Sequence, residues 1–151
     1  MTIPDRGSTG RAAKAGEPGE ADLQTLLDLL SPKLMTGEYV FCSLKTAKYG
    51  DYAETAPIAS FQEKEGLTLV VRKESADQHG FTYNNTYRCI TLGVHSSLDA
   101  IGLTATVSAR LSEKQISANI IAAYFHDHVF VPSNRAGEAL AVLSALRSGR
   151  R

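Results

Sequence analysis

The sequence offers few features that would tie it to a particular chemistry or compartment. Its only two cysteines, Cys42 and Cys89, each lie in an apolar run, so a disulfide framework is not expected. Its 16 Lys and Arg residues balance 16 Asp and Glu residues, which argues against nucleic-acid binding by counterion release and against a basic membrane-surface protein. No apolar run reaches the roughly 18 to 20 residues of a membrane helix, and residues 1–20 lack the apolar stretch of a secretory signal. We therefore expect a cytoplasmic protein without nucleic-acid or membrane partners.

Catalytic and metal-binding motifs are also missing. The sequence has no Gly-x-Ser-x-Gly elbow, Walker A loop, Gly-x-Gly-x-x-Gly turn, or Cys-x-x-Cys or His-Glu-x-x-His zinc spacing. His126 and His128 would share one face of a strand. They could hold a metal if His95 or Cys89 supplied a third ligand, or they could be solvated or hydrogen-bonded histidines. We favour the second interpretation and expect no enzyme, no metal site and no cofactor.

The first half of the chain predicts a tail followed by a small α+β unit. Residues 1–20 contain four glycines and two prolines among scattered charges, a composition typical of a disordered tail. Leucines at positions 23, 26, 27 and 30 fall on one helical face, and Ser31-Pro32 would end that helix. Beyond it we expect strands at 38–44, 58–62 and 67–72, a loop at 45–57 and a short helix at 75–79.

The second half predicts a similar set of elements in a shifted order. We expect a strand at 87–94, a helix at 98–111 capped by Ser96 or Ser97, strands at 116–125 and 126–131, and a last helix after 132–134. The first half reads helix, strand, strand, strand, helix, and the second reads strand, helix, strand, strand, helix. The sequence thus predicts an α+β fold with two units, at 21–85 and 86–151, each an antiparallel sheet with helices on one face.

Four stretches of the second half carry a family resemblance. They are Val-His-Ser-Ser-Leu at 94–98, Gly-Leu at 102–103, Ile-Ser-Ala-Asn at 116–119 and His-Asp-His-Val-Phe-Val-Pro at 126–132. Together they resemble the ACT-domain family, and more closely the small two-ACT bacterial and fungal proteins related to the ACT repeats of aspartate kinase. The resemblance implies two ferredoxin-like units of the βαββαβ type, the first cyclically shifted. It also implies a homodimer that binds a small regulatory molecule, usually an amino acid.

Asp127 is the residue that the resemblance marks most sharply. The Asp-His-x-x-Val-Pro stretch that begins at Asp127 is similar to one in the eukaryotic cytosolic arginine sensors, in which the aspartate contacts the bound amino acid. Those sensors have four ACT units, a number that a homodimer of this chain would restore. Strand alternation alone puts Asp127 on one face with Val129 and Val131, which is typical either of a pocket edge or of a paired structural acid.

A free amino acid also needs donors for its carboxylate, which the start of a helix can supply. The connection before the expected helix offers Ser97 and the backbone of Leu98. Gly102 would cost about 1 kcal/mol inside that helix, so it marks a close approach either of a ligand or of another part of the backbone. Asn119 interrupts an apolar strand, where a buried amide would either tie down a loop or face the ligand.

The function predicted from these residues and from the resemblance is a regulatory module that binds a small molecule, which we expect to be an amino acid. Its candidate site comprises Asp127, Asn119, Ser97, Leu98 and Gly102. The alternative is a module without a ligand that serves dimerisation or protein interaction, because the edge strands of small sheets pair readily with other chains.

Overall fold

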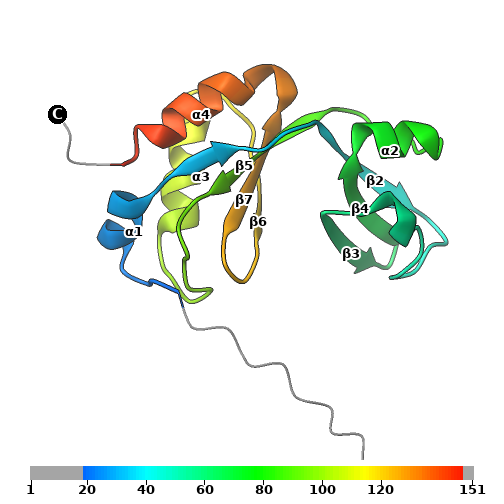
Figure 1. The fold of residues 1–151 in the computed structure, drawn as a ribbon, viewed down its shortest axis with the longest axis horizontal. Helices are drawn as coiled ribbons and strands as arrows, with labels where there is room; N and C mark the ends of the chain where they lie inside the picture. Colours follow the sequence, from blue (N-terminus) through cyan, green and yellow to red (C-terminus); the bar gives the residue numbers. More distant parts are fainter. Residues whose placement is uncertain (1–18, 148–151) are drawn as a thin grey trace, which may run out of the picture.

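The computed structural model describes residues 19–147, whose strands form one curled antiparallel sheet (Figure 1). The strand order is β3-β4-β2-β5-β7-β6, and β1 pairs with β5 beside this path. The strands are β1 (Pro32–Leu34), β2 (Tyr39–Leu44), β3 (Ala59–Glu63), β4 (Gly66–Arg72), β5 (Tyr87–Leu92), β6 (Asn119–Ala122) and β7 (Asp127–Pro132). The α+β class and the antiparallel sheet expected from the sequence are confirmed.

The helices divide unequally between the two ends of this sheet. They are α1 (Leu23–Leu29), α2 (Lys73–Gln78), α3 (Leu103–Glu113) and α4 (Ala136–Ser144), with 3-10 turns η1 (Ala53–Thr55) and η2 (Ser133–Arg135). Helices α1, α3 and α4 gather beside β5, β7 and β6, whereas α2 lies at the other end with β2, β3 and β4 (Figure 1). None of the helices within residues 19–147 is long and apolar enough to cross a bilayer.

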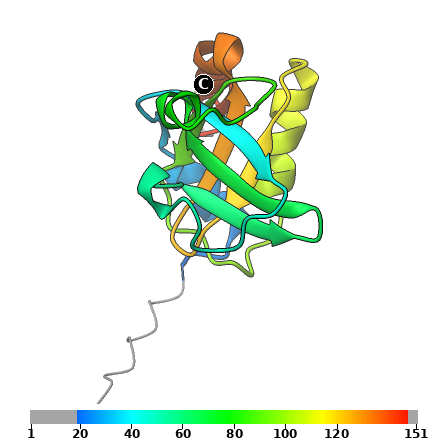
Figure 2. The same cartoon turned by 90° about the vertical axis from the view of Figure 1, so that its right-hand side faces the viewer.

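The two ends of the sheet repeat one arrangement. The β2–β4 pairing begins at Tyr39↔Arg72 and the β5–β7 pairing at Tyr87↔Pro132, and Tyr39 pairs with Tyr87 where the two halves meet. Each half continues through an edge strand, β3 or β6, and ends in a helix, α2 or α4. Figure 2 looks onto the half made by β2, β3 and β4. We call this half the first unit, and the half with β5, β6 and β7 the second unit.

The second unit is completed by the start of the chain. Leu26 and Leu30 are fully buried in a core with residues such as Ile90, Leu111 and Leu143 from β5, α3 and α4. Strand β1 extends the same sheet by pairing with β5. Helix α1 and β1, whose residues the sequence prediction assigned to the unit at 21–85, therefore pack with the second unit and not with the first. Residues 1–18 of the expected tail lie outside the described residues.

An aromatic cluster joins the two units on the face of the sheet away from α3 and α4. Phe41 packs edge-on against Phe130 and Tyr87, at centroid distances of 5.5 and 5.3 Å, and Tyr39 packs against Phe130 at 5.8 Å. Such edge-to-face pairs are favourable in addition to the area they bury. The cluster therefore packs the first unit against the second across the middle of the sheet.

The helix expected at 98–111 is wrong at its beginning. Helix α3 starts at Leu103, and its N-cap is Gly102 rather than Ser96 or Ser97. Gly102 has φ +100°, a left-handed conformation that ends any right-handed helix extending from upstream. Before it, Ser97 organises a turn: its Oγ accepts a hydrogen bond from the Asp99 amide, at 3.1 Å.

Other boundaries also differ from the expectations. Strand β6 is confined to Asn119–Ala122, and the strand 116–125 was too long because an apolar run does not mark where pairing stops. The sequence did not indicate β1, whose three residues start at the proline that ends α1. Glu20, placed in the tail, instead forms a parallel bridge with Ser96.

Candidate functional site

Asp127 is the one acidic residue that is buried among the described residues. It opens β7, where it pairs with Ala122 of β6, and only 8% of its surface is exposed. Ser96, itself buried, donates a hydrogen bond from Oγ to Asp127 Oδ2, at 3.2 Å. A buried carboxylate has several lone pairs to satisfy, so this single long hydrogen bond leaves Asp127 able to accept further donors.

Asp127 faces a small cavity of about 60 Å³ at the start of α3. Leu103 and Thr104, from the first turn of that helix, line it together with Ser97 and Leu98. The first amide groups of a helix have no partner within the helix and carry the positive end of its dipole. The cavity is thus lined both by a carboxylate and by the first turn of a helix, whose amides lack partners within the helix.

A second hollow, of about 140 Å³, shares Ser97 and Leu98 with this cavity. Its remaining wall comes from Gly19, Asp99 and Tyr124. The beginning of the described chain is held here by backbone hydrogen bonds. The Glu20 amide donates to the His95 carbonyl at 2.9 Å, and the Ser97 amide donates to the Glu20 carbonyl at 2.7 Å.

Exposed apolar side chains surround these two hollows. Leu98 and Ile101, in the loop before α3, are 62% and 85% exposed. Tyr124 and Phe125, at the tip of the β6–β7 hairpin, are about half exposed, and the Phe125 ring packs on the His95 ring with centroids 4.8 Å apart. We call these four exposed residues the apolar rim. A patch of this kind beside a polar cleft is typical of an interaction surface.

The structure gathers three of the five candidate residues and separates two. Asp127, Ser97 and Leu98 line the same cavity. Gly102 does not line it and acts as the N-cap that sets the start of α3. Asn119 pairs with Phe130 on the face opposite Asp127 and is exposed. The buried amide expected there is therefore wrong.

Two polar residues of the cavity were missed from the sequence, Ser96 and Thr104. Ser96 donates a hydrogen bond to Asp127, but from the sequence it was predicted only as a possible helix cap. Thr104 was hidden inside a helix expected to begin at position 98. The signal was Gly102: if it is taken as the N-cap, Thr104 falls in the first turn of the helix, where the backbone amides have no partner within the helix.

The histidines near Asp127 do not assemble a metal site. Thr91 Oγ1 and His128 Nδ1 lie 2.9 Å apart on the face opposite Asp127. Burial lowers the pKa of His128, the neighbouring charge of His126 lowers it further, and Asp127 acts in the opposite direction. Within residues 19–147 no group of three or more His, Cys, Asp or Glu side chains is placed to hold a metal ion.

Two models of the ACT domain match the chain, one over residues 18–88 and one over residues 84–145. The chain belongs to the ACT-domain family. The two matches support the ferredoxin-like ACT arrangement expected from the sequence, although the first of them includes α1 and β1, which pack with the second unit. Among curated proteins, none matches this ACT protein.

Solved structures extend this comparison. A protein of unknown function from Vibrio cholerae, described as a possible transport protein, is 46% identical, with a TM-score of 0.76 over 83% of this chain and 96% of that one. The ligand-free regulatory subunit of aspartate kinase from Thermus thermophilus has a TM-score of 0.52 at 10% identity, over 75% and 94% of the two chains. An Agrobacterium tumefaciens protein reaches 0.65 at 17% identity, over 78% and 89%. The last two likenesses concern the fold.

Proposed function

We propose that this ACT protein is a regulatory module that binds a free amino acid at the cavity beside Asp127. The observation that carries the proposal is the juxtaposition of the buried Asp127 carboxylate with Leu103 and Thr104, the first turn of α3. The aspartate kinase regulatory subunit, which shares the fold, supports a regulatory role.

The two ends of an amino acid would use different parts of this site. Asp127 would accept hydrogen bonds from a ligand ammonium or guanidinium, because charge-assisted pairs are the stronger hydrogen bonds. The carboxylate would take the free amides at the start of α3. Ser97 lines both the cavity and the adjoining hollow, so it would contact a ligand that extends from one into the other.

Regulation would follow from linkage. A ligand bound where β7, the loop before α3 and the apolar rim meet would stabilise one arrangement of that rim over another by its differential affinity. In this proposal the rim contacts a second copy of the chain, and the site works within a homodimer in the cytoplasm.

The test is a thermal-shift series with the common amino acids, followed by calorimetric titration of any that stabilise the protein. A ligand at about 100 times its dissociation constant adds roughly 2.7 kcal/mol of stability, which is on the order of 5 °C for a domain of this size. Asp127→Asn should abolish the shift while the variant stays folded. The exposed Glu65→Gln, in the turn between β3 and β4 of the first unit, removes one carboxylate away from both hollows; it is the control and should keep the shift.

A second candidate function is a dimerisation or protein-interaction module without a ligand. The apolar rim favours it, because Ile101 is 85% exposed and Leu98 is 62% exposed beside a cavity of only about 60 Å³. Sedimentation of the wild type and of Ile101→Ser separates the two functions. A dimer that depends on Ile101, with no stabilisation by any amino acid, would support the interaction module and contradict the amino-acid site.

A further inference from the structure

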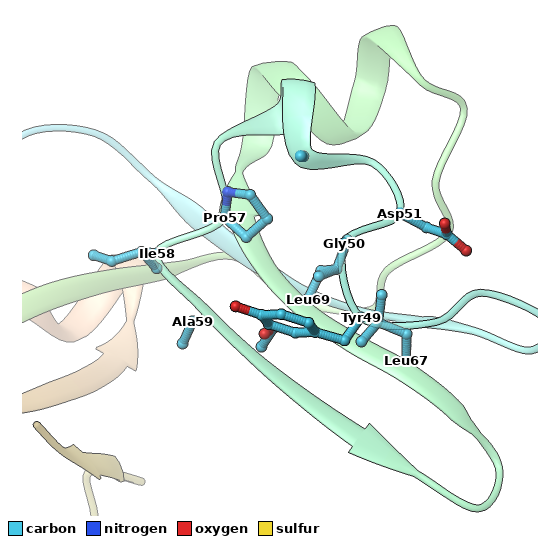
Figure 3. Close-up of a pocket in the computed structure, with 10 residues that line it drawn as sticks. Tyr49, Gly50, Asp51, Pro57, Ile58, Ala59, Leu67 and Leu69 are labelled. Atoms are coloured by element: carbon cyan, nitrogen blue, oxygen red, sulfur yellow. The ribbon is translucent and has the colours of Figure 1, made fainter. Parts of the chain in front are cut away.

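A cleft with an apolar floor lies in the first unit, far along the sheet from Asp127. It has a volume of about 420 Å³ and opens between the loop 45–58 and the β3–β4 hairpin (Figure 3). Leu67 and Leu69 of β4 form its floor and are almost fully buried. A volume above about 300 Å³ is in the range of small-molecule sites in proteins.

This cleft occupies the same place in the first unit as the Asp127 cavity does in the second. Leu67 lies five residues before Arg72, the residue paired with Tyr39, and Asp127 lies five residues before Pro132, which is paired with Tyr87. The connecting loops correspond as well, because Tyr49 and Ser97 each lie ten residues after those tyrosines. Leu67 of the first unit thus has the position that Asp127 has in the second, and Tyr49 has the position of Ser97.

With leucine at the position of Asp127, the cleft of the first unit has no carboxylate on its floor. Among the residues that line the cleft, Asp51 is the only charged one. Its Oδ2 already accepts the Lys48 amide, at 2.8 Å, and Figure 3 shows its carboxylate pointing away from Leu67 and Leu69. Because the Asp51 carboxylate points away from the leucines, a charged group placed over the leucine floor would have no opposite charge facing it, and burying an unpaired charge is costly.

An exposed aromatic ring takes the place of the missing polar groups. Tyr49 is 82% exposed, and its ring lies across the cleft between Ala59 and the leucine floor (Figure 3). Its backbone is fixed, because the Tyr49 amide donates to Gln62 Oε1 at 2.9 Å. A tyrosine held in this way presents a ring face for stacking and a hydroxyl for one hydrogen bond. Ser60 adds a second hydroxyl at the wall.

The loop that carries Tyr49 holds its shape at a conformational cost. Tyr52 and Ala56 both have a positive φ, 59° and 48°, which is unfavourable for residues with a side chain. Strained positions of this kind persist where the surroundings enforce them, and they occur often at ligand sites. The wall of the cleft formed by Ala53 and Pro57 lies within this strained segment.

We propose that this cleft is a second ligand site, which takes a small uncharged molecule with an aromatic ring. The ring would stack against the exposed Tyr49 ring, above the buried leucines, and a polar substituent would reach the Tyr49 or Ser60 hydroxyl. The only charged lining side chain, Asp51, points away from the leucines, so a charged ligand is disfavoured, and a cleft of about 420 Å³ is too small to seat a helix of a partner protein. The inference is independent of amino-acid binding at Asp127.

The experiment is an NMR titration of the full-length ¹⁵N-labelled protein with indole and with benzyl alcohol, followed by amide chemical shifts. Saturable shifts are expected at Tyr49, Gly50 and Ser60, with no change at Ser96, Ser97 or Asp127. Benzylammonium ion and phenylacetate, which add one charge to a similar ring, should bind at least tenfold more weakly.

Two variants locate the site. Ser60→Trp fills the cleft from an exposed position on its wall and should abolish the saturable shifts. Ser43→Trp, exposed on β2 and on the opposite face of the sheet, is the matched control and should leave them unchanged. Tyr49→Ala should weaken indole binding about tenfold, the loss expected for a stacking contact.

Three results would overturn the proposal. Shifts that rise linearly with indole concentration would show solvent effects without a site. Saturable shifts that survive Ser60→Trp would place the ligand elsewhere. A change in sedimentation caused by Tyr49→Ala, with no saturable binding of either uncharged probe, would assign the cleft to a contact between copies of the chain.

Discussion

The two units of this ACT protein place different chemistry on corresponding backbone. In both units a central strand, β2 or β5, is followed by a connection to an edge strand, β3 or β6. A hairpin then leads to β4 or β7, which pairs with the central strand. The second unit crosses with α3, and the first crosses with the loop 45–58 and a single 3-10 turn. Where the helix is present, a carboxylate faces its first turn. Where the helix is missing, leucines and a tyrosine line a wider cleft.

The difference suggests a rule, that the carboxylate occurs where its surroundings can accommodate it. A buried aspartate is tolerable where a donor faces it and the positive end of a helix dipole is near, and Ser96 and the first turn of α3 meet these two conditions. In the first unit no helix begins opposite Leu67, so a carboxylate at that position would be buried without a partner. The predictions below test this pairing, from the largest expected effect to the smallest.

Leu67→Asp should cause the largest loss of stability. Leu67 is fully buried, and an unpaired charge at such a position costs about 3 to 5 kcal/mol of the free energy of unfolding. Urea denaturation at pH 7 measures the loss, which should shrink near pH 4 as the new carboxyl becomes protonated. Leu67→Met, similar in volume, should cost less than about 1.5 kcal/mol. A stable Leu67→Asp protein would mean that the first unit can also supply donors.

Ser96→Ala should have a smaller effect confined to the second unit. It removes the donor to Asp127, so the free energy of unfolding should fall by about 1.5 kcal/mol, as expected for a hydrogen bond to a charged group. A double-mutant cycle with Asp127→Asn measures the coupling by urea denaturation. Additive losses in the two single variants would show that the 3.2 Å contact contributes nothing to stability.

Gly102→Ala tests how α3 is placed over the cavity. The residue has φ +100°, and an added Cβ would lie 3.0 Å from Leu23 Cδ2, so the substitution is strained and should cost about 1 to 2 kcal/mol. Gly137→Ala, in α4 with open space around the new Cβ, is the control and should be neutral or stabilising by about 1 kcal/mol. Thermal unfolding of the two variants should move in opposite directions, and an equal response would contradict the role of the cap.

His128→Gln should have the smallest effect, visible as pH dependence. The pKa of His128 is lowered in the folded state from the ordinary 6.5, mainly by burial. The unfolded chain then binds the proton more readily, so stability present above pH 6.5 is lost as the pH falls through the lower folded pKa. Urea denaturation between about pH 7.5 and pH 5.5 should show a shallower slope for the variant. An unchanged slope would show that His128 titrates as an exposed histidine does.

The sequence predicted those parts of this fold that hydrophobic spacing controls. The alternation in β7 correctly placed Asp127 with Val129 and Val131, because all three are buried. It could not orient Asn119, because β6 is an edge strand of apolar residues with both faces partly exposed, and a uniform run does not reveal its buried side.

Two further features depended on backbone geometry that spacing does not encode. The positive φ of Gly102 moved the start of α3 by five residues from the expected 98 to 103, and with it the cavity lining. Strand β1 has three residues and begins with a proline, so no alternation could indicate it. It forms because β5 offers it a partner far along the chain, a tertiary effect.

Because β1 pairs with β5, which lies more than fifty residues later in the chain, the second unit cannot be completed until β5 has been synthesised. Residues 23–34 leave the ribosome before the strand and helices that bury Leu26 and Leu30, because those elements lie beyond residue 86. The apolar segment therefore stays without its partners until more than fifty further residues have been made, a period in which nascent chains are prone to aggregate. The first unit, whose strands pair within residues 39–72, can close meanwhile. A fragment that starts at residue 86 would lack α1 and β1, which complete its core and its sheet, although the second ACT-domain match covers residues 84–145.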